Sequence, residues 1–216
     1  MRFDTLFFDL DGTLTDPAEG ICGCARYALE KGGYPVGPKE DYYPWIGPPL
    51  ELSFAQRVGV SQEEARRLVG FYRERYSTVG LFENRVYAGI PRLLQALQAD
   101  GARMAVTTGK PTVFSRRILE KFGILERFEA VCGISLTEAP LTKEGVITQA
   151  MSLLDVRDKS RCLMIGDRMH DVEGAHLCGI PCVYVLYGYG SREEAAQCGA
   201  DYVVDSVEAL GDFLLK

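Results

Sequence analysis

The hydrophobic residues of this chain follow different periods in different parts of the sequence. Residues 3–10, which include the apolar run Leu6, Phe7 and Phe8, predict a buried strand. From about Pro17 to about residue 82, apolar residues recur at helical spacing, so this part predicts helices and turns. From Val86 onward, short apolar runs alternate with amphipathic segments, which indicates that strands and helices alternate.

The alternating part defines the predicted fold. Strands are expected at 103–108, 130–133, 162–165, 181–186 and 202–204, and helices at 91–99, 114–122, 143–154, 171–178, 192–198 and 207–215. This order predicts an α/β fold with a doubly wound, Rossmann-like parallel sheet. Because the helical part follows the first strand, it reads as an insert. The predicted domains are a core (1–15 and 84–216) and an α-helical cap (16–83).

Two local signals predict helix ends within the cap. Gly32 and Gly33, followed by Tyr34-Pro35, are typical of the end of a helix. Ser61 with Glu64 three residues later forms a capping-box pattern, which predicts a helix beginning after Ser61.

Composition and charge narrow the choice of partners. The chain has 216 residues, 47% of them hydrophobic, which is enough for one core with a smaller insert. Its 24 basic and 30 acidic residues give a net charge of −6, which disfavours a nucleic acid polymer or an anionic membrane as the main partner. No stretch is long enough to span a membrane. We expect a monomer or a dimer.

The cysteines indicate a reducing compartment. There are seven, an odd number, and they are scattered, which predicts buried, reduced thiols and a cytoplasmic location. The first apolar run is ended by Asp9 and is too short for a secretory leader.

The most informative polar residues lie at the end of the first predicted strand. Asp9 and Asp11 are two residues apart, so on an extended chain their side chains point the same way. Such a pair fits a site for a hard cation, and a carboxylate can also attack phosphorus. Taken alone, the pair also fits an Asp-Gly turn after a strand.

Other polar residues fall at the same edge of the predicted sheet, where ligands bind in folds of this type. Each of these residues, taken alone, also fits a turn or a solvated helix start. It is improbable that all of them fall at one edge of the sheet by chance. They are Thr107-Thr108-Gly109-Lys110, Lys143, Gly166-Asp167 and Asp171.

Hydrolysis of a phosphate monoester requires a nucleophile, a proton donor and groups that hold the phosphoryl oxygens. Asp9 is the predicted nucleophile, and Asp11 the general acid and then the general base. The Thr108 hydroxyl and the Gly109 amide are predicted to bind the phosphoryl group, and Lys143 to neutralise its charge.

The same chemistry requires a divalent metal. Asp167, with Asp171 nearby, is predicted to bind Mg²⁺ together with Asp9. Acids that stay ionised side by side need a cation among them, because otherwise their pKa values rise.

These residues resemble a known family. Asp9-Leu10-Asp11-Gly12-Thr13, Thr108, Lys143 and Gly166-Asp167-x-x-x-Asp171 are similar, in order, to the four motifs of the haloacid-dehalogenase-like (HAD) superfamily. The helical insert after the first motif resembles the phosphoglycolate-phosphatase-like branch.

The resemblance implies further roles. It makes the backbone carbonyl of Asp11 a Mg²⁺ ligand. It implies a cap that closes over the site, with loops that select the substrate, and Gly47, Pro48 and Pro49 are the candidates for such a loop. The phosphate-binding threonine is either Thr107 or Thr108, and Thr108 is preferred because it lies two residues before Lys110-Pro111, as in the relatives.

The predicted function is therefore a Mg²⁺-dependent phosphatase for a small phosphorylated metabolite, similar to phosphoglycolate phosphatases. The alternatives are a 5'-nucleotidase acting on nucleoside monophosphates and a phosphomutase of the same fold. A non-enzymatic binding module is disfavoured, because a binder needs no nucleophile and acid together. The chain has no G-x-S-x-G motif, and no G-x-G-x-x-G follows the first strand.

Overall fold

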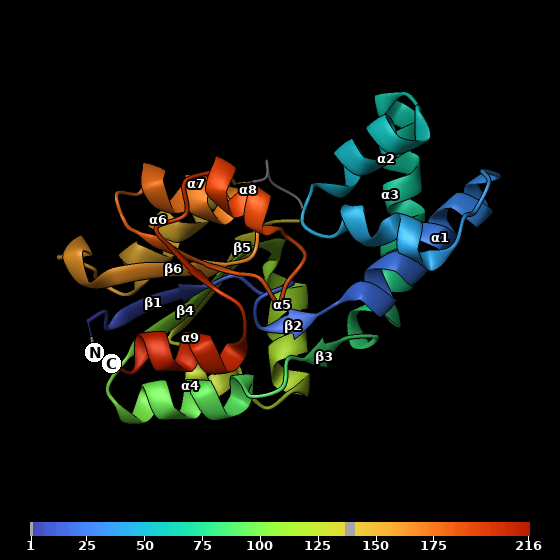
Figure 1. The fold of residues 1–216 in the computed structure, drawn as a ribbon. Coiled ribbons are helices and arrows are strands. Elements are labelled where there is room, and N and C mark those ends of the chain that lie inside the picture. Colours follow the sequence, from blue (N-terminus) through green and yellow to red (C-terminus); the bar gives the residue numbers. More distant parts are fainter. Residues whose placement is uncertain (1, 137–140) are drawn as a thin grey trace. The chain divides into compact units, whose positions relative to one another are not determined.

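The computed structural model describes residues 2–136 and 141–216, and the chain divides into two compact units (Figure 1). The core comprises Met1–Asp16 and Val86–Lys216, and the cap comprises Pro17–Arg85. Each boundary lies one or two residues further along the chain than the sequence pattern places it.

Six strands among the described residues of the core form one parallel sheet. They are β1 Thr5–Phe8, β4 Arg103–Pro111, β5 Ala130–Ile134, β6 Cys162–Gly166, β7 Cys182–Val185 and β8 Tyr202–Val204. Their order across the sheet is β5-β4-β1-β6-β7-β8, so the first strand lies in the middle. The chain extends the sheet from β1 to β5 on one side and then from β6 to β8 on the other.

Helices cover both faces of this sheet (Figure 1). They are α4 Ile90–Ala99, α5 Thr112–Lys121, α6 Lys143–Leu153, α7 Met169–Leu177, α8 Arg192–Gln197 and α9 Val207–Leu214. Figure 1 shows α6, α7 and α8 on one face and α4 and α9 on the other. The predicted fold class, a doubly wound α/β core, is confirmed.

The central strand β1 is buried on both faces. Leu6, Phe7 and Phe8 are fully buried, and Phe7 belongs to a core cluster with Met164 of β6 and Val172 of α7. A parallel strand with helices on both sides needs apolar residues at successive positions, which explains the unbroken apolar run in the sequence.

Strand β1 is shorter than the predicted strand 3–10, because the chain turns after Asp9. The carbonyl of Leu10 accepts hydrogen bonds from the N–H groups of Leu14 and Thr15, both at 2.9 Å. Gly12 completes this turn with a φ of 86°, a conformation that glycine adopts without the strain a Cβ would bring. Leu10 is buried in the turn rather than in the sheet. Asp9 and Asp11 thus lie at the exit of the strand.

The described part of the cap is helical. Its elements are α1 Ala18–Gly32, η1 Lys39–Trp45, α2 Leu50–Val58, α3 Gln62–Tyr76 and η2 Gly80–Phe82. Gly33 ends α1 in the left-handed conformation, and the Ser61 hydroxyl caps α3 by accepting from the Glu64 N–H at 3.2 Å. Both predicted helix ends are confirmed.

Aromatic side chains form the interior of the cap near α2. The Trp45 ring packs edge to face with Phe54 at 4.9 Å between ring centres and lies 5.5 Å from the Tyr42 ring. All three side chains are buried. Their burial contributes to the cap's own core, because large rings remove much apolar surface from water.

Two short strands, β2 Thr15–Asp16 and β3 Arg85–Val86, pair where the chain leaves the core and returns to it. Among the helices that the structure describes, none is long and apolar enough to cross a membrane.

Candidate active site

The order of the strands determines where a ligand can bind in the core. Successive strands are added on one side of β1 and then on the other, so the sheet has a switch point between β1 and β6. In doubly wound folds, the crevice at the carboxyl ends of such strands is the ligand site. Asp9 directly follows β1, and Asp167 directly follows β6.

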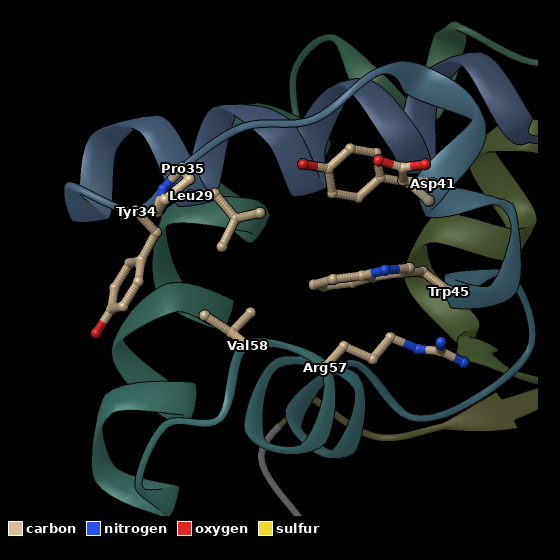
Figure 2. A pocket seen from close by; sticks show the side chains of 8 residues that line it. Leu29, Tyr34, Pro35, Asp41, Trp45, Arg57 and Val58 are labelled. Carbon is tan, nitrogen blue, oxygen red and sulfur yellow. The ribbon is translucent and has the colours of Figure 1, made fainter.

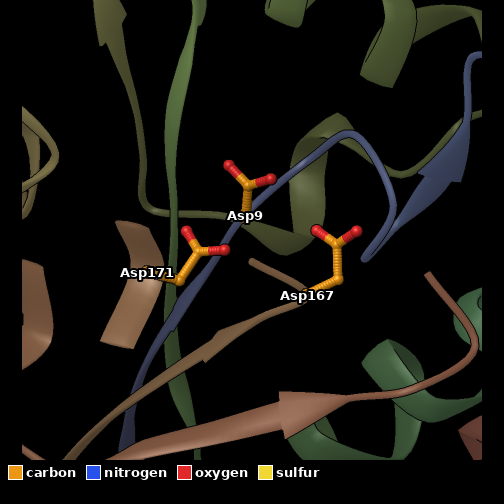
Figure 3. A group of neighbouring side chains, drawn as sticks. All are labelled: Asp9, Asp167 and Asp171. Atoms are coloured by element: carbon orange, nitrogen blue, oxygen red, sulfur yellow. The ribbon is translucent and has the colours of Figure 1, made fainter. Parts of the chain in front are cut away.

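Three acids meet at this point, as Figure 3 shows. Asp9, Asp167 and Asp171 each offer one carboxylate oxygen, and these atoms all lie within 4.8 Å of one another. The side chains are buried, with exposed fractions of 8%, 0% and 1%. Three buried carboxylates are costly unless cations compensate their charge.

Asp167 has the features of a metal ligand. Its Oδ2 accepts the backbone N–H of Tyr189 at 2.7 Å, while its Oδ1 is buried without a hydrogen-bond partner among the described residues. Burial, followed by the charges of Asp171 and Asp9, raises the pKa of Asp167 well above its ordinary 3.8. An unpartnered carboxylate oxygen beside two further carboxylates fits a hard divalent cation such as Mg²⁺.

Lys143 supplies a positive charge to the same cluster. Its Nζ lies 2.7 Å from Asp9 Oδ1 and 2.6 Å from Asp171 Oδ1, and it donates to the carbonyl of Thr107 at 3.0 Å. Burial acts to lower the pKa of Lys143, but the charges of Asp171 and Asp9 outweigh it and raise that pKa, so the ammonium stays charged. A Cβ on Gly174 of α7 would lie 2.6 Å from Lys143 Cγ, so this close approach needs glycine.

Asp171 belongs to the acid cluster and also forms an ion pair with Lys143. Its Oδ2 accepts the Arg168 N–H at 3.1 Å, which caps α7, and its Oδ1 pairs with Lys143. Burial raises the pKa of Asp171, although Lys143 opposes this. Both oxygens are thus engaged, and the position of Asp171 holds Lys143 against Asp9. Its predicted role as a metal ligand stays a prediction.

Asp11 has a different partner from the other acids. Its Oδ2 forms a buried ion pair with Lys110 of β4, and its carboxylate is not part of the three-acid cluster. Burial raises the pKa of Asp11, while the charge of Lys110 lowers it. A carboxyl group with a raised pKa, held apart from the metal acids, suits a proton donor and acceptor.

Sequence reasoning gave Lys110 no role of its own. Phe8 of β1 lies opposite Val106 of β4 in the sheet, and this register brings Lys110 to Asp11. The stretch Lys110-Pro111 was part of the family resemblance, which was the only signal available for it.

The two candidate threonines have different surroundings. The Thr107 hydroxyl donates to the sulfur of Met164 at 3.3 Å inside the core. The Thr108 hydroxyl accepts the N–H of Lys110 at 3.2 Å, and Gly109 beside it is exposed. This arrangement supports Thr108 and Gly109 as the phosphate-binding pair, because the Thr107 hydroxyl already has a partner in the core.

The predicted loop Gly47, Pro48 and Pro49 lies in the cap between η1 and α2, and its role in substrate selection stays a prediction. The cap contains a pocket with a volume of about 340 Å³, and Figure 2 shows the side chains that line it. It is lined by Leu29, Tyr34, Pro35, Asp41, Tyr42, Trp45, Arg57 and Val58. None of the predicted site residues lines it.

We expect Mg²⁺ to stabilise the protein through Asp167. At a concentration of about 100 times its dissociation constant, Mg²⁺ should raise the Tm by about 5–10 °C, measured by differential scanning fluorimetry against EDTA. Asp167→Asn should abolish this shift.

The same substitution should stabilise the metal-free protein. The pKa of Asp167 is raised in the folded state, so ionisation of this carboxyl group costs folding stability. The cost grows as the pH rises from 3.8 through the folded-state pKa. In EDTA near pH 7.5, Asp167→Asn should therefore have a higher Tm than the wild type.

The control for this prediction is Asp205→Asn. Asp205 is an exposed carboxylate paired with Arg192, and its loss should leave the Mg²⁺ shift unchanged. A full Mg²⁺ shift in Asp167→Asn would show that the metal does not bind at this cluster.

Comparisons with known proteins agree with this geometry. The family described as "Haloacid dehalogenase-like hydrolase" matches residues 6–185. A 5'-nucleotidase of Pseudomonas aeruginosa is 43% identical over 90% of this chain and 87% of its own length. A phosphoglycolate phosphatase of Caulobacter vibrioides is 32% identical over 94% and 86%.

A solved structure is similar over the whole chain. The crystal structure of a predicted phosphatase from Clostridium acetobutylicum is 41% identical and has a TM-score of 0.94, covering 100% of this chain and 99% of that one. The motifs in the sequence, the acids gathered at the switch point and these relatives lead to one assignment. The chain belongs to the haloacid dehalogenase-like hydrolase family, within its phosphoglycolate-phosphatase-like branch of phosphatases.

Proposed function

We propose that the protein is a Mg²⁺-dependent phosphatase that hydrolyses a small phosphorylated metabolite through an aspartyl-phosphate on Asp9. The observation that carries this proposal is the pairing of the two acids at the exit of β1. Asp9 faces Lys143 at 2.7 Å and lies in the acid cluster, whereas Asp11 is paired with Lys110. The nucleophile and the proton donor thus have separate environments.

The chemistry proceeds in two transfers. A carboxylate oxygen of Asp9 attacks phosphorus, the bond from phosphorus to the leaving oxygen breaks, and Asp11 gives its proton to that oxygen. Asp11 then takes a proton from a water molecule, which attacks the phosphorus of the aspartyl-phosphate and releases inorganic phosphate and free Asp9. Lys143 balances the charge of Asp9 and of the phosphoryl group, and Thr108 and Gly109 hold phosphoryl oxygens.

Asp9, Asp167 and the carbonyl of Asp11 would hold Mg²⁺, with Asp171 at the edge of the cluster. The ion would neutralise negative charge on the phosphoryl group when bound. The seven cysteines are all free, which fits the predicted reducing, cytoplasmic location.

A 5'-nucleotidase is the second candidate function. It is favoured by the identity of 43% to a relative of that name, compared with 32% to a phosphoglycolate phosphatase. Both functions use the same core chemistry, and they differ only in the group attached to the phosphate. The phosphomutase alternative additionally requires that water be kept away from the aspartyl-phosphate between two transfers.

A phosphate-release screen distinguishes these functions. The purified protein is assayed with Mg²⁺ against phosphoglycolate, nucleoside monophosphates, sugar phosphates and pyrophosphate, and glucose 1-phosphate is also tested for isomerisation. We expect release that EDTA abolishes, with one class well above the rest. A preference for nucleoside monophosphates would establish the second candidate. Isomerisation without release would identify a mutase, and no turnover of any ester would contradict the proposal.

A further inference from the structure

The loop between β7 and α8 lies directly against Asp167, one of the proposed metal ligands. The Tyr189 N–H donates to Asp167 Oδ2 at 2.7 Å. A Cβ on Gly188 would lie 2.4 Å from Asp167 Cβ and 2.4 Å from the carbonyl oxygen of Gly12. The loop reaches this position only because residue 188 has no side chain. The sequence Gly188-Tyr189-Gly190 by itself indicates no more than a turn.

The side chain of Tyr189 reaches the other way, toward the start of the cap. Its hydroxyl donates to Asp16 Oδ1. Asp16 is the last residue of the core before the chain enters the cap at Pro17. Burial and the neighbouring Asp16 raise the pKa of Tyr189, so the hydroxyl keeps the proton that it donates. Tyr189 thus contacts Asp167, a proposed metal ligand, through its backbone N–H. Through its side chain it contacts Asp16, which lies in the linker between the core and the cap.

The same loop also contacts Thr13, just before the chain enters the cap, and Tyr87, just after the chain returns to the core. The Tyr187 hydroxyl donates to the carbonyl of Thr13 at 3.1 Å, and the Tyr187 ring packs edge to face with Tyr87 at 5.1 Å. Tyr87 follows Val86, the first core residue after the cap, and its N–H donates to the carbonyl of Leu14 at 3.1 Å. Both core ends of the linkers are therefore attached to the loop that orients Asp167.

We infer that Tyr189 is a positioning residue that couples the metal site at Asp167 to the linker at Asp16. This inference rests on the proposed function, because it takes Asp167 as a metal ligand. A cation bound to Asp167 fixes that carboxylate, the Tyr189 backbone that hydrogen-bonds to it, and thereby Asp16. By linkage, an ordered linker then favours metal binding to the same extent that the metal favours an ordered linker.

Hydrogen exchange measures this coupling without any assay of turnover. Exchange of the amides of residues 13–16 is followed by mass spectrometry with and without Mg²⁺. In the wild type we expect Mg²⁺ to slow this exchange about fivefold or more. In Tyr189→Phe the backbone bond to Asp167 remains, but the bond to Asp16 is lost, so Mg²⁺ should slow exchange at residues 13–16 less than half as much as in the wild type. The slowing that remains comes from the Asp11 carbonyl as a proposed metal ligand and from the Tyr187 bond to the Thr13 carbonyl. The apparent Mg²⁺ affinity should fall by the factor by which the slowing is reduced.

The matched control is Tyr34→Phe. The Tyr34 hydroxyl also donates to a carboxylate, Glu64 Oε1 at 3.0 Å, but within the cap. This variant should keep the full response of residues 13–16 to Mg²⁺. Asp16→Asn keeps an acceptor oxygen for Tyr189 and should retain most of the response, whereas Asp16→Ala removes the acceptor and should weaken the response as Tyr189→Phe does. If Tyr189 were merely structural, Asp16→Ala would keep the full response.

The outcomes separate this inference from the proposed function. A normal Mg²⁺ response of residues 13–16 in Tyr189→Phe would overturn the coupling and leave the phosphatase proposal intact. The same conclusion would follow if the wild type hydrolysed esters with Mg²⁺ but showed no slowing at residues 13–16. A wild type that neither binds Mg²⁺ nor hydrolyses any ester would contradict both.

Discussion

Replacing Asp9 with asparagine should lower kcat for phosphate release by about 10⁴-fold or more. An amide cannot form the acyl phosphate, so the variant loses the covalent route itself and not only a contact. The fold should persist, because Lys143 keeps Asp171 as a partner at 2.6 Å and asparagine has nearly the same volume. The measurement is inorganic phosphate release from p-nitrophenyl phosphate with Mg²⁺, alongside circular dichroism to verify folding.

Asp155→Asn is the matched control for this substitution. Asp155 is exposed and pairs only with Arg157 in the described structure, and its φ of 46° suits asparagine well. Its activity should equal that of the wild type. If Asp9→Asn retained more than about a tenth of the wild-type rate, Asp9 would not be the nucleophile.

The fold was largely predictable, because its signals are local. The buried run around β1 and the alternation after Val86 depend on residues close together in the chain. The same holds for Asp9 and Asp167, because each directly follows a strand of the sheet. In a parallel sheet the ends of all strands lie at one edge, so a residue's position after its strand is enough to place it there.

Contacts between distant residues were not predictable in the same way. The pairing of Lys110 with Asp11 depends on the register of β1 against β4. The bonds of Tyr189 join residues 22 and 173 positions apart. Helix α7 begins at Met169, two residues before the predicted start, because Glu194 of α8 accepts the Met169 N–H at 2.7 Å. Hydrophobic periodicity carries no information on such pairs, since it describes only which face of an element is buried.

Replacing Lys143 with methionine should affect both stability and catalysis. Methionine keeps the length of the stem beside Gly174 but removes the ammonium, so Asp9 and Asp171 lose their buried cation. Breaking a buried ion pair by removing one partner costs about 3–5 kcal/mol of unfolding free energy. We also expect kcat to fall by about 10²–10³-fold, because the charge on the transferring phosphoryl group loses a preorganised cation.

The pH dependence of that stability loss identifies its cause. Burial already raises the pKa of Asp171 while Lys143 opposes it, so removing Lys143 raises that pKa further. A carboxyl group with a raised folded-state pKa costs stability above that pKa and recovers it as the pH falls and the folded protein takes up the proton. In EDTA, the difference between Lys143→Met and wild type should therefore be larger at pH 7.5 than at pH 5, measured by urea denaturation.

Lys31→Met is the control that tests whether the loss of any lysine–carboxylate ion pair causes a comparable, pH-dependent loss of stability. Lys31 pairs with Glu74 at 2.6 Å, as closely as Lys143 pairs with Asp171, but the two side chains are 37% and 54% exposed. Solvent screens the charges of an exposed ion pair, so this variant should lose little stability at either pH. Equal losses for Lys143→Met at pH 5 and pH 7.5 would mean that lost packing, and not uncompensated buried charge, accounts for the effect. The acid cluster would then not depend on Lys143 for its charge balance.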